Sequence, residues 1–178
     1  KFCTIKGGYS GDQYGDQFRW TSNDGKLDFY RKASNGTASI DLNTDKASIV
    51  AQLVKGFEPG FTYELSFDVN RNTDCGPTTK TGTAYVNAWD LNTEMSFSVD
   101  NDQWQRKQFS FVALATEHRI NFRSTTPDAC GPLIDNVVVK VINLVKNPTF
   151  NSTFTNFKGY ALASTIFPDN SWFAKRDF

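Results

Sequence analysis

Apolar and polar residues alternate along most of this 178-residue chain, and this period of two narrows the possible folds more than any motif does. Over 63–69 (Tyr-Glu-Leu-Ser-Phe-Asp-Val) the odd-numbered residues are apolar and the even-numbered ones are polar. Successive side chains of a β-strand point to opposite faces, so this pattern predicts a strand with one buried face. The alternation recurs at 109–111, 120–122 and 137–141, whereas helical periodicity is almost absent.

Weaker strand patterns cover 26–30, 38–42, 48–54, 83–88 and 94–99. Segments rich in Gly, Pro, Asn and Asp, which favour turns, lie between them at 23–25, 34–36, 58–60, 76–77 and 124–128. About nine short strands separated by turns predict an all-β fold, an antiparallel β-sandwich or jelly roll.

Two flanking stretches differ from the predicted sandwich at 19–142. Residues 1–18 are rich in Gly, Asp, Gln and Tyr and are predicted to form an N-terminal arm or long loop. Residues 143–178 form a C-terminal extension that holds eight of the 26 aromatic residues. Large apolar side chains each gain roughly 1.5–3 kcal/mol on burial, so the extension is expected to pack against another surface.

The composition argues against several functions. Lys plus Arg and Asp plus Glu each number 19, so the net charge is zero and no basic surplus exists to hold nucleic acid or anionic lipid. No apolar run approaches the length of a membrane-spanning helix. A single His removes most metal and acid–base chemistry. These features favour a folded, non-catalytic domain without a cofactor.

The cysteines suggest an oxidising compartment. Cys75 and Cys130 each begin a Cys-Gly-Pro triplet after a polar, loop-like segment. Loop cysteines this far apart, without His or Cys neighbours, are poor zinc ligands, so a disulfide is favoured over a pair of reduced thiols. Cys3 is then unpaired within the chain and is predicted to bond to another chain or to a partner.

Two N-glycosylation acceptor triplets fit a secreted protein. They begin at Asn35 and Asn151, whereas the proline after Asn147 blocks a third. The sequence begins Lys-Phe-Cys rather than with Met, which is typical of a processed chain. The predicted location is therefore extracellular or at the cell surface.

A set of segments resembles a known family. These segments are Arg-Trp-Thr at 19–21, Gly-Lys-Leu-Asp-Phe-Tyr at 25–30, Ala-Ser-Ile-Asp-Leu at 38–42, Pro-Gly-Phe-Thr-Tyr-Glu-Leu-Ser-Phe-Asp at 59–68, and the stretch from Asp128 to Val139 that contains Cys-Gly-Pro-Leu-Ile-Asp. Their order resembles the galactose-binding-like jelly rolls of plant cell-wall proteins that contain a domain of unknown function, and of related bacterial surface domains. The resemblance covers about residues 19–142. It implies an extracellular, usually non-catalytic β-sandwich related to carbohydrate-binding modules, with Cys130 paired to an upstream cysteine that Cys75 would match.

The chain departs from this family pattern at its start. The family opens with a strand resembling Asn-Leu-Leu-x-Asn-Gly-x-Phe-Glu, and the arm shows no such strand. A related segment, Asn-Leu-Val-Lys-Asn-Pro-Thr-Phe-Asn, occurs instead at 143–151. The extension could fold back as a circular permutation, begin a truncated second domain, or complete the sandwich of another copy by strand donation.

Two separate segments contain candidate calcium ligands. Asp41, Asn43 and Asp45 begin like a calcium-binding loop, but Lys46 and Gln52 replace its glycine and glutamate, so a turn with solvated carboxylates is predicted. Asp135 occupies a place where related sandwiches often hold a structural calcium. The family's partner Glu would fall on Asn151, which makes Asp135 a weak candidate.

Catalytic constellations are not apparent. His118 is assigned to the polar phase of the strand around Ile120 and is predicted to be exposed, and no nucleophile-elbow motif accompanies it. Asp100-Asn-Asp102 is predicted to be a turn rather than an acid–base pair.

Sugar recognition needs aromatic rings, which stack on the C–H face of a pyranose, beside amides and carboxylates, which bind hydroxyls. The best local set is Tyr85, Asn87, Trp89 and Asp90, because Tyr85 and Trp89 are out of phase with the apolar residues of their strand. The alternative is that these rings belong to the core or contact the extension.

The leading prediction is a subunit of an extracellular filament that polymerises head to tail by strand donation. Its partners would be other copies of the chain, and the alternative is a non-catalytic carbohydrate-binding module with polysaccharide as partner. The residues expected to enter a neighbouring copy are Leu144, Phe150, Phe154, Phe157, Tyr160, Trp172 and Phe173.

Overall fold

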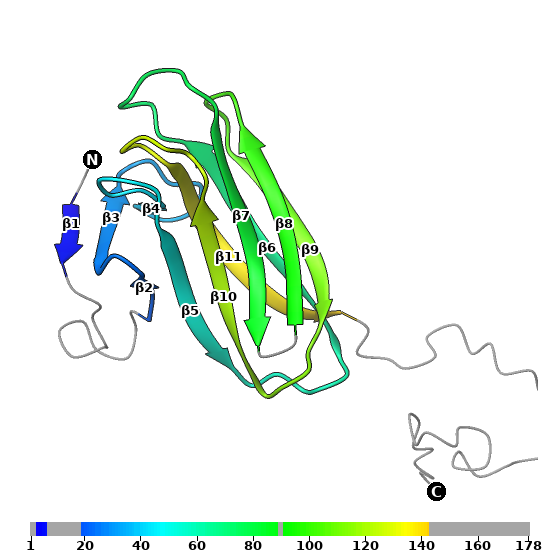
Figure 1. The fold of residues 1–178 in the computed structure, drawn as a ribbon. Helices are drawn as coiled ribbons and strands as arrows, with labels where there is room; N and C mark the ends of the chain where they lie inside the picture. Colours follow the sequence, from blue (N-terminus) through cyan, green and yellow to red (C-terminus); the bar gives the residue numbers. More distant parts are fainter. Residues whose placement is uncertain (1–2, 7–18, 89–90, 143–178) are drawn as a thin grey trace, which may run out of the picture.

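Two antiparallel β-sheets packed face to face form the described part of the protein (Figure 1). The computed structural model describes residues 3–6, 19–88 and 91–142. The strands are β1 (Cys3–Lys6), β2 (Thr21–Ser22), β3 (Lys26–Tyr30), β4 (Ser39–Asp41), β5 (Ile49–Lys55), β6 (Thr62–Arg71), β7 (Lys80–Ala88), β8 (Leu91–Val99), β9 (Gln105–Val112), β10 (Glu117–Ser124) and β11 (Pro132–Ile142). The predicted all-β sandwich is confirmed, and its described residues contain no helix that could cross a membrane.

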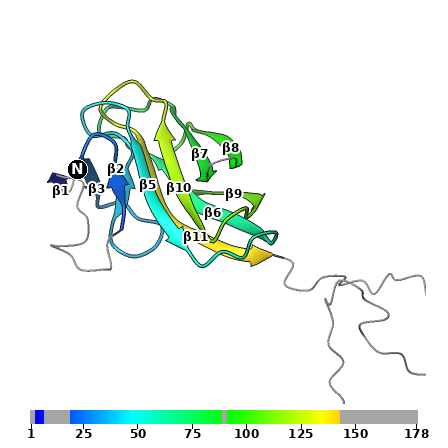
Figure 2. The same ribbon diagram turned by 60° about the horizontal axis from the view of Figure 1, so that its bottom comes forward.

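The strand order places neighbours that are distant in sequence side by side. The six-stranded sheet has the order β1-β3-β4-β11-β6-β9, and the five-stranded sheet has the order β2-β5-β10-β7-β8. Figure 2 shows the two layers from another direction, with β6 and β9 of one sheet below β7 and β8 of the other. Because β6 and β7 belong to different sheets, as do β10 and β11, the chain crosses between the sheets at both connections.

The core follows from the alternation in the sequence. Leu65, Phe67 and Val69 of β6 point inward and are completely buried. The Phe67 ring meets rings from the opposite sheet, with centroids 4.9 Å from Phe122 and 5.5 Å from Phe97. Such edge-to-face contacts add about 0.5–1.5 kcal/mol per pair to the burial itself, so these rings add to the packing of the two sheets against each other.

The N-terminal arm contributes a strand that its sequence does not announce. Residues of β1 pair antiparallel with β3, in register from Cys3 opposite Phe29 to Lys6 opposite Lys26. Ladder hydrogen bonds involve only backbone groups, so a segment can pair without the family's opening motif. The prediction of an arm or long loop is therefore corrected for Cys3–Lys6, which form a strand beside β3 at the edge of the six-stranded sheet.

Candidate functional site

Tyr85 stands on the outer face of the five-stranded sheet. It is half-buried, whereas Ala84 and Val86 on either side of it in β7 are completely buried in the core. The strand register places Asn121 of β10 on one side of Tyr85 and Glu94 of β8 on the other. The predicted phase of Tyr85 is correct, and the core alternative does not hold for this ring.

Charged and polar groups fix the surroundings of this ring. The Arg123 guanidinium lies 5.8 Å from the Tyr85 ring centroid and donates to Glu94 Oε1 at 2.8 Å. A cation near an aromatic face is attracted by the ring quadrupole, by about 0.5–1 kcal/mol at exposed sites. Beneath them, Asn121 is buried and its side-chain amide donates to the Arg119 carbonyl at 2.9 Å. The Tyr85 ring is therefore surrounded by polar side chains whose positions are fixed by hydrogen bonds.

The rest of this outer face offers hydrogen-bonding groups to solvent. The side chains of Arg119, Arg123, Glu94 and Ser96 are exposed, and Leu53 adds an apolar side chain on β5. A flat surface of this kind, with one aromatic ring among donors and acceptors, can stack a ring with apolar C–H bonds and bind hydroxyls around its edge.

The other members of the predicted sugar-contact set are placed less fully. Asn87 lies in β7, opposite Arg119 of β10 and Asn92 of β8 in the register. Trp89 and Asp90 lie outside the described residues. Their role stays a prediction.

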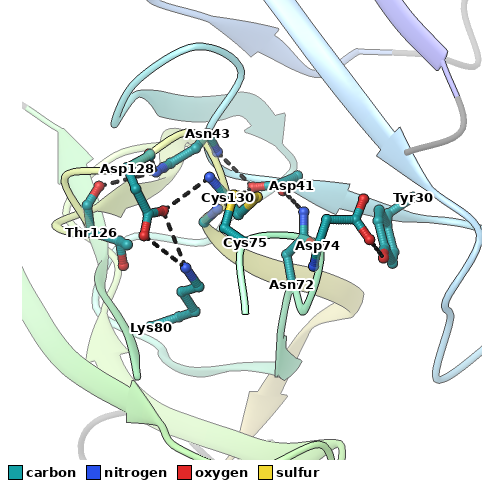
Figure 3. Close-up of a disulfide and its surroundings, with 11 residues drawn as sticks. Tyr30, Asp41, Asn43, Asn72, Asp74, Cys75, Lys80, Thr126, Asp128 and Cys130 are labelled. Atoms are coloured by element: carbon teal, nitrogen blue, oxygen red, sulfur yellow. Dashed lines mark hydrogen bonds and ion pairs between the residues drawn. A yellow bond between two sulfur atoms is a disulfide. The ribbon is translucent and has the colours of Figure 1, made fainter. Parts of the chain in front are cut away.

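The disulfide between Cys75 and Cys130 joins two loops at one end of the sandwich (Figure 3). The Cα atoms are 5.8 Å apart, within the range that an unstrained bridge requires. Cys75 lies in the connection between β6 and β7, and Cys130 lies in the connection between β10 and β11. The bridge therefore ties together two of the connections that cross between the sheets.

Asp41 accepts hydrogen bonds from three parts of the chain close to this disulfide. Its carboxylate takes the backbone N–H of Asn43 at 2.8 Å and of Gly131 at 2.9 Å, and the Asn72 amide at 2.6 Å. Asp41 is only 4% exposed, so the prediction of solvated carboxylates is wrong for this residue, although Asp45 is exposed. A Cβ on Gly131 would lie 2.7 Å from Asp41 Oδ1, which explains the glycine there.

Burial raises the pKa of Asp41 to about 6, because loss of water outweighs the three hydrogen bonds and the nearby Asp28 carboxyl adds repulsion. The folded protein then binds a proton more tightly than the unfolded chain, so this group's contribution to stability is complete below about pH 4 and is lost as the pH rises to about 6. We expect the free energy of unfolding of the wild type, minus that of Asp41→Asn, to fall by roughly 2–3 kcal/mol over this interval.

Urea unfolding of both proteins at several pH values measures this difference. Asp45→Asn, at the exposed carboxylate of the same segment, is the control and should follow the wild type. Burial lowers the pKa of His118, so the contribution of His118 to the free energy of unfolding rises with pH. This contribution is the same in the wild type and in both variants, and it therefore cancels when their free energies of unfolding are subtracted. A difference that does not change between pH 4 and 6 would contradict the burial argument.

Asp135 is occupied by donors of the protein itself. Its Oδ2 accepts the backbone N–H groups of Ser34 at 2.7 Å and Asn35 at 2.9 Å. In the described ranges no group of three or more His, Cys, Asp or Glu side chains is arranged to hold a metal ion. Asp135 therefore fixes the loop between β3 and β4, which is the loop that carries the exposed Asn35 triplet. Glycosylation of Asn35 stays a prediction.

His118 is buried, so its predicted exposure is wrong. Its exposed fraction is 0%, and its ring meets Phe57 and Phe111 edge-on at centroid distances of 4.9 and 5.8 Å. Residues 118, 120 and 122 have the same parity and share the inner face of β10, which the assignment to the polar phase overlooked. His118 is thus an aromatic core residue in this protein.

Several predicted positions lie outside the described residues. These are the second glycosylation triplet at Asn151 and the proposed assembly residues Leu144, Phe150, Phe154, Phe157, Tyr160, Trp172 and Phe173. Cys3 lies in β1, and its bond to another chain or partner stays a prediction.

Comparison with known proteins identifies the family. Residues 17–140 match the family described as "Protein of unknown function (DUF642)". The chain belongs to the DUF642 family. The resemblance drawn from the sequence segments is thereby confirmed. The DUF642 chain is also 31% identical over 127 residues to Halomucin from Haloquadratum walsbyi (strain DSM 16790 / HBSQ001); the match spans 67% of this chain but 1% of Halomucin.

Two solved structures share the DUF642 fold. The structure titled as the CBM22-1 xylan-binding domain from Paenibacillus barcinonensis Xyn10C has a TM-score of 0.55 and 16% identity, covering 78% of this chain and 92% of that one. The structure titled as TmCBM61 in complex with β-1,4-galactotriose has a TM-score of 0.51 and 13% identity, covering 70% and 88%. At these identities the likeness shows the fold, a jelly-roll sandwich.

The predicted filament subunit, with other copies of the chain as partners, is corrected by these findings. These two solved domains are, by their titles, a xylan-binding domain and a module in complex with β-1,4-galactotriose, which favours the alternative prediction over a filament subunit. The argument for strand donation is also weakened, because the N-terminal arm contributes a strand, β1, that pairs with β3.

Proposed function

We propose that this DUF642 domain is a non-catalytic carbohydrate-binding module of an extracellular or cell-surface protein, with polysaccharide as its ligand. Two lines of support bear on this proposal. The solved domains of the same fold bind, by their titles, xylan and a β-1,4-linked galactotriose. The Cys75–Cys130 disulfide is of the kind that persists in oxidising compartments.

The observation that carries the proposal is the position of Tyr85. A half-buried aromatic ring lies between Asn121 and Glu94, on a sheet face whose other exposed side chains are mainly polar. Core-facing aromatics are explained by packing, whereas the Tyr85 ring stands on the outer face with the Arg123 guanidinium near it and keeps apolar surface available to a ligand. Stacking against the C–H face of a pyranose would remove its remaining apolar surface from water.

The polar groups around the ring suit a sugar chain better than a small apolar ligand. Arg119, Arg123 and Glu94 offer charged donors and acceptors, which make strong hydrogen bonds to hydroxyl groups. They come from β10 and β8, on both sides of the Tyr85 strand. An open face across neighbouring strands can follow an extended polymer, whereas small molecules favour enclosed pockets.

We expect Tyr85→Ala to weaken polysaccharide binding by about tenfold or more, because the lost stacking surface is worth roughly 1.5–3 kcal/mol when buried. Affinity electrophoresis against a panel that includes β-1,4-galactan and xylan measures this loss. Tyr30→Ala is the matched control, since Tyr30 is a half-buried tyrosine in the other sheet and donates to Asp74 Oδ1 at 2.5 Å. It should leave binding unchanged.

Two results would refute the proposal. One is a wild-type protein that is retarded by no polysaccharide of the panel. The other is retardation that is the same for the wild type and Tyr85→Ala, since the outer face would then not be the binding surface.

A further inference from the structure

The two sheets leave an opening near their short strands β2 and β4. β2 has two residues and β4 has three, and β4 pairs with β11 only at Leu133 and Ile134. Beside this short pairing lies a cleft of about 300 Å³ between the sheets. It is distinct from the outer face that carries Tyr85, because its lining residues come from the inner faces and the edge of the sandwich. Its main walls are formed by Trp20, Phe29, Ile40, Gln52, Asn136 and Val137.

Aromatic rings from opposite sheets line the cleft. Trp20 immediately precedes β2 of the five-stranded sheet, and Phe29 belongs to β3 of the six-stranded sheet. Both are only partly buried. The Trp20 ring leans on Phe122, with centroids 5.9 Å apart, so its position is fixed by the core. The cleft therefore presents flat apolar surfaces on a rigid base.

Gln52 is a polar residue at a core-facing position. It lies on β5 between Val50 and Val54, both of which pack into the core, and opposite Ile120 of β10. Among the described residues no group hydrogen-bonds its side-chain amide, although the residue is half-buried and lines the cleft. The alternation of β5 predicts an aliphatic residue at this position, and the glutamine departs from it. The departure occurs where the side-chain amide could hydrogen-bond to a ligand in the cleft.

A β-bulge forms the remaining rim. The register of β11 against β6 shifts between Asp135 and Val138, and Asn136 has φ of 48°. Arg106 donates to the Asn136 carbonyl at 2.8 Å, and the Asn136 amide donates to Asp68 at 3.0 Å, so the bulge is held from the outer face. Bulges are common beside binding sites because they redirect the chain locally.

The charges at the cleft indicate a neutral ligand. Of the described residues that line it, Asp135 is the only charged one. Its carboxylate already accepts the N–H groups of Ser34, Asn35 and Asn136. No lining cation is therefore available to hold a phosphate or carboxylate, and the negative charge is already satisfied by the protein.

We propose that this cleft binds a single neutral pyranose residue, such as the end of a glycan chain, between Trp20 and Phe29 with its hydroxyls on Gln52. A volume of about 300 Å³ is at the lower limit for ligand pockets and suits one sugar ring rather than an extended chain. The inference rests on the carbohydrate-binding function proposed above but concerns a separate site. The outer face would hold the polymer, and the cleft would recognise a terminal unit.

Titration of the ¹⁵N-labelled protein with methyl β-glycosides of galactose, xylose and glucose tests this site. At least one glycoside should shift the Trp20 indole and Gln52 amide signals together and saturably, with Trp20→Phe used to assign the indole. Gln52→Val should weaken this binding about tenfold or more while the melting temperature stays equal or rises, because valine fits the core-facing phase. Leu114→Ala, at an exposed aliphatic residue in the connection between β9 and β10, is the control and should bind as the wild type does.

Three results would overturn the inference: no glycoside shifts these signals, Gln52→Val binds like the wild type, or the shifts are abolished by Tyr85→Ala. Polysaccharide electrophoresis separates this failure from that of the proposed function. Gln52→Val should be retarded like the wild type, whereas Tyr85→Ala should not. If Gln52→Val is retarded and Tyr85→Ala is not, but no glycoside binds in the cleft, the outer face remains the proposed sugar site and only the cleft proposal is rejected.

Discussion

Removing the disulfide by Cys75→Ser with Cys130→Ala will lower the free energy of unfolding by about 4 kcal/mol. The bridge closes a loop of 55 residues, and chain entropy alone gives a penalty of this size when such a loop is released in the unfolded state. A domain of this kind has a total stability of about 5–15 kcal/mol, so the variant should remain folded but with a small margin. Urea unfolding monitored by tryptophan fluorescence measures the change.

The surroundings of the disulfide indicate which contacts of the folded protein remain when the disulfide is removed. Cys130 is almost buried, its N–H donates to Asp128 Oδ1 at 3.0 Å, and the next residue, Gly131, donates to Asp41. These hydrogen bonds hold the connection between β10 and β11 without the sulfur atoms (Figure 3). We therefore expect the loop to keep its conformation, and the loss to come from the unfolded state. Amide exchange that rises across the whole sandwich would agree with this expectation.

Cys3→Ser is the matched control for the double variant, because Cys3 is the cysteine outside the bridge. It should leave the urea midpoint unchanged under conditions in which the protein is monomeric. Reduction of the wild type with dithiothreitol should reproduce the midpoint of the double variant. Equal midpoints for the oxidised wild type and the double variant would contradict a stabilising role for the bridge.

The fold could be predicted from the sequence because it depends on local alternation. The buried residues Leu65, Phe67 and Val69 are the odd-numbered residues of a segment whose even-numbered ones are polar. Prediction from alternation fails where a residue is assigned to the wrong face of its strand, as at His118. It also fails for β1, whose pairing with β3 depends on backbone groups that every sequence possesses.

The candidate sugar face could be predicted only in part. The outward phase of Tyr85 can be predicted because the alternation within β7 shows it. Its neighbours Arg123 and Glu94 come from β10 and β8, and only the strand order of the folded sheet brings them together. Sequence alone gives no register between strands that are distant in the chain.

Buried polar residues were the hardest to predict, because their partners come from distant loops. Asp41 is buried where Asn43, Asn72 and Gly131 converge on it. Lys80 is a stronger case. It lies on the inner phase of β7 with Ala84 and Val86, and its exposed fraction is 0%. Hydropathy would place such a residue in solvent, yet the fold encloses it.

The ammonium of Lys80 is paired with the carboxylate of Asp128, at 3.1 Å from both oxygens. Asp128 follows β10 in the loop that leads to Cys130, so the pair links the start of β7 to the disulfide region (Figure 3). The two partners differ in their access to water, since the Asp128 side chain is 40% exposed and the Lys80 side chain is fully buried. Loss of the carboxylate should therefore cost more than loss of the ammonium.

We expect Asp128→Asn to lower the free energy of unfolding by about 3 kcal/mol, because it leaves a buried ammonium without its counter-charge. Asparagine retains an oxygen that can accept the Cys130 N–H, so the loss reports on the charge rather than on the loop. The value lies at the lower end for broken buried pairs because water reaches this carboxylate. Equilibrium unfolding in urea at pH 7 measures it.

Lys80→Met supplies the contrast that makes this prediction decisive. Methionine keeps most of the side-chain length and packs against the core without a charge, so this variant should lose less than about 1 kcal/mol. The double variant, Lys80→Met with Asp128→Asn, should regain most of the stability that Asp128→Asn alone loses, because no unpaired ammonium remains. Such non-additivity is what a direct pair produces. If the double variant instead shows the sum of the two single losses, Lys80 and Asp128 stabilise the sandwich independently, and the carboxylate acts through its hydrogen bond to Cys130.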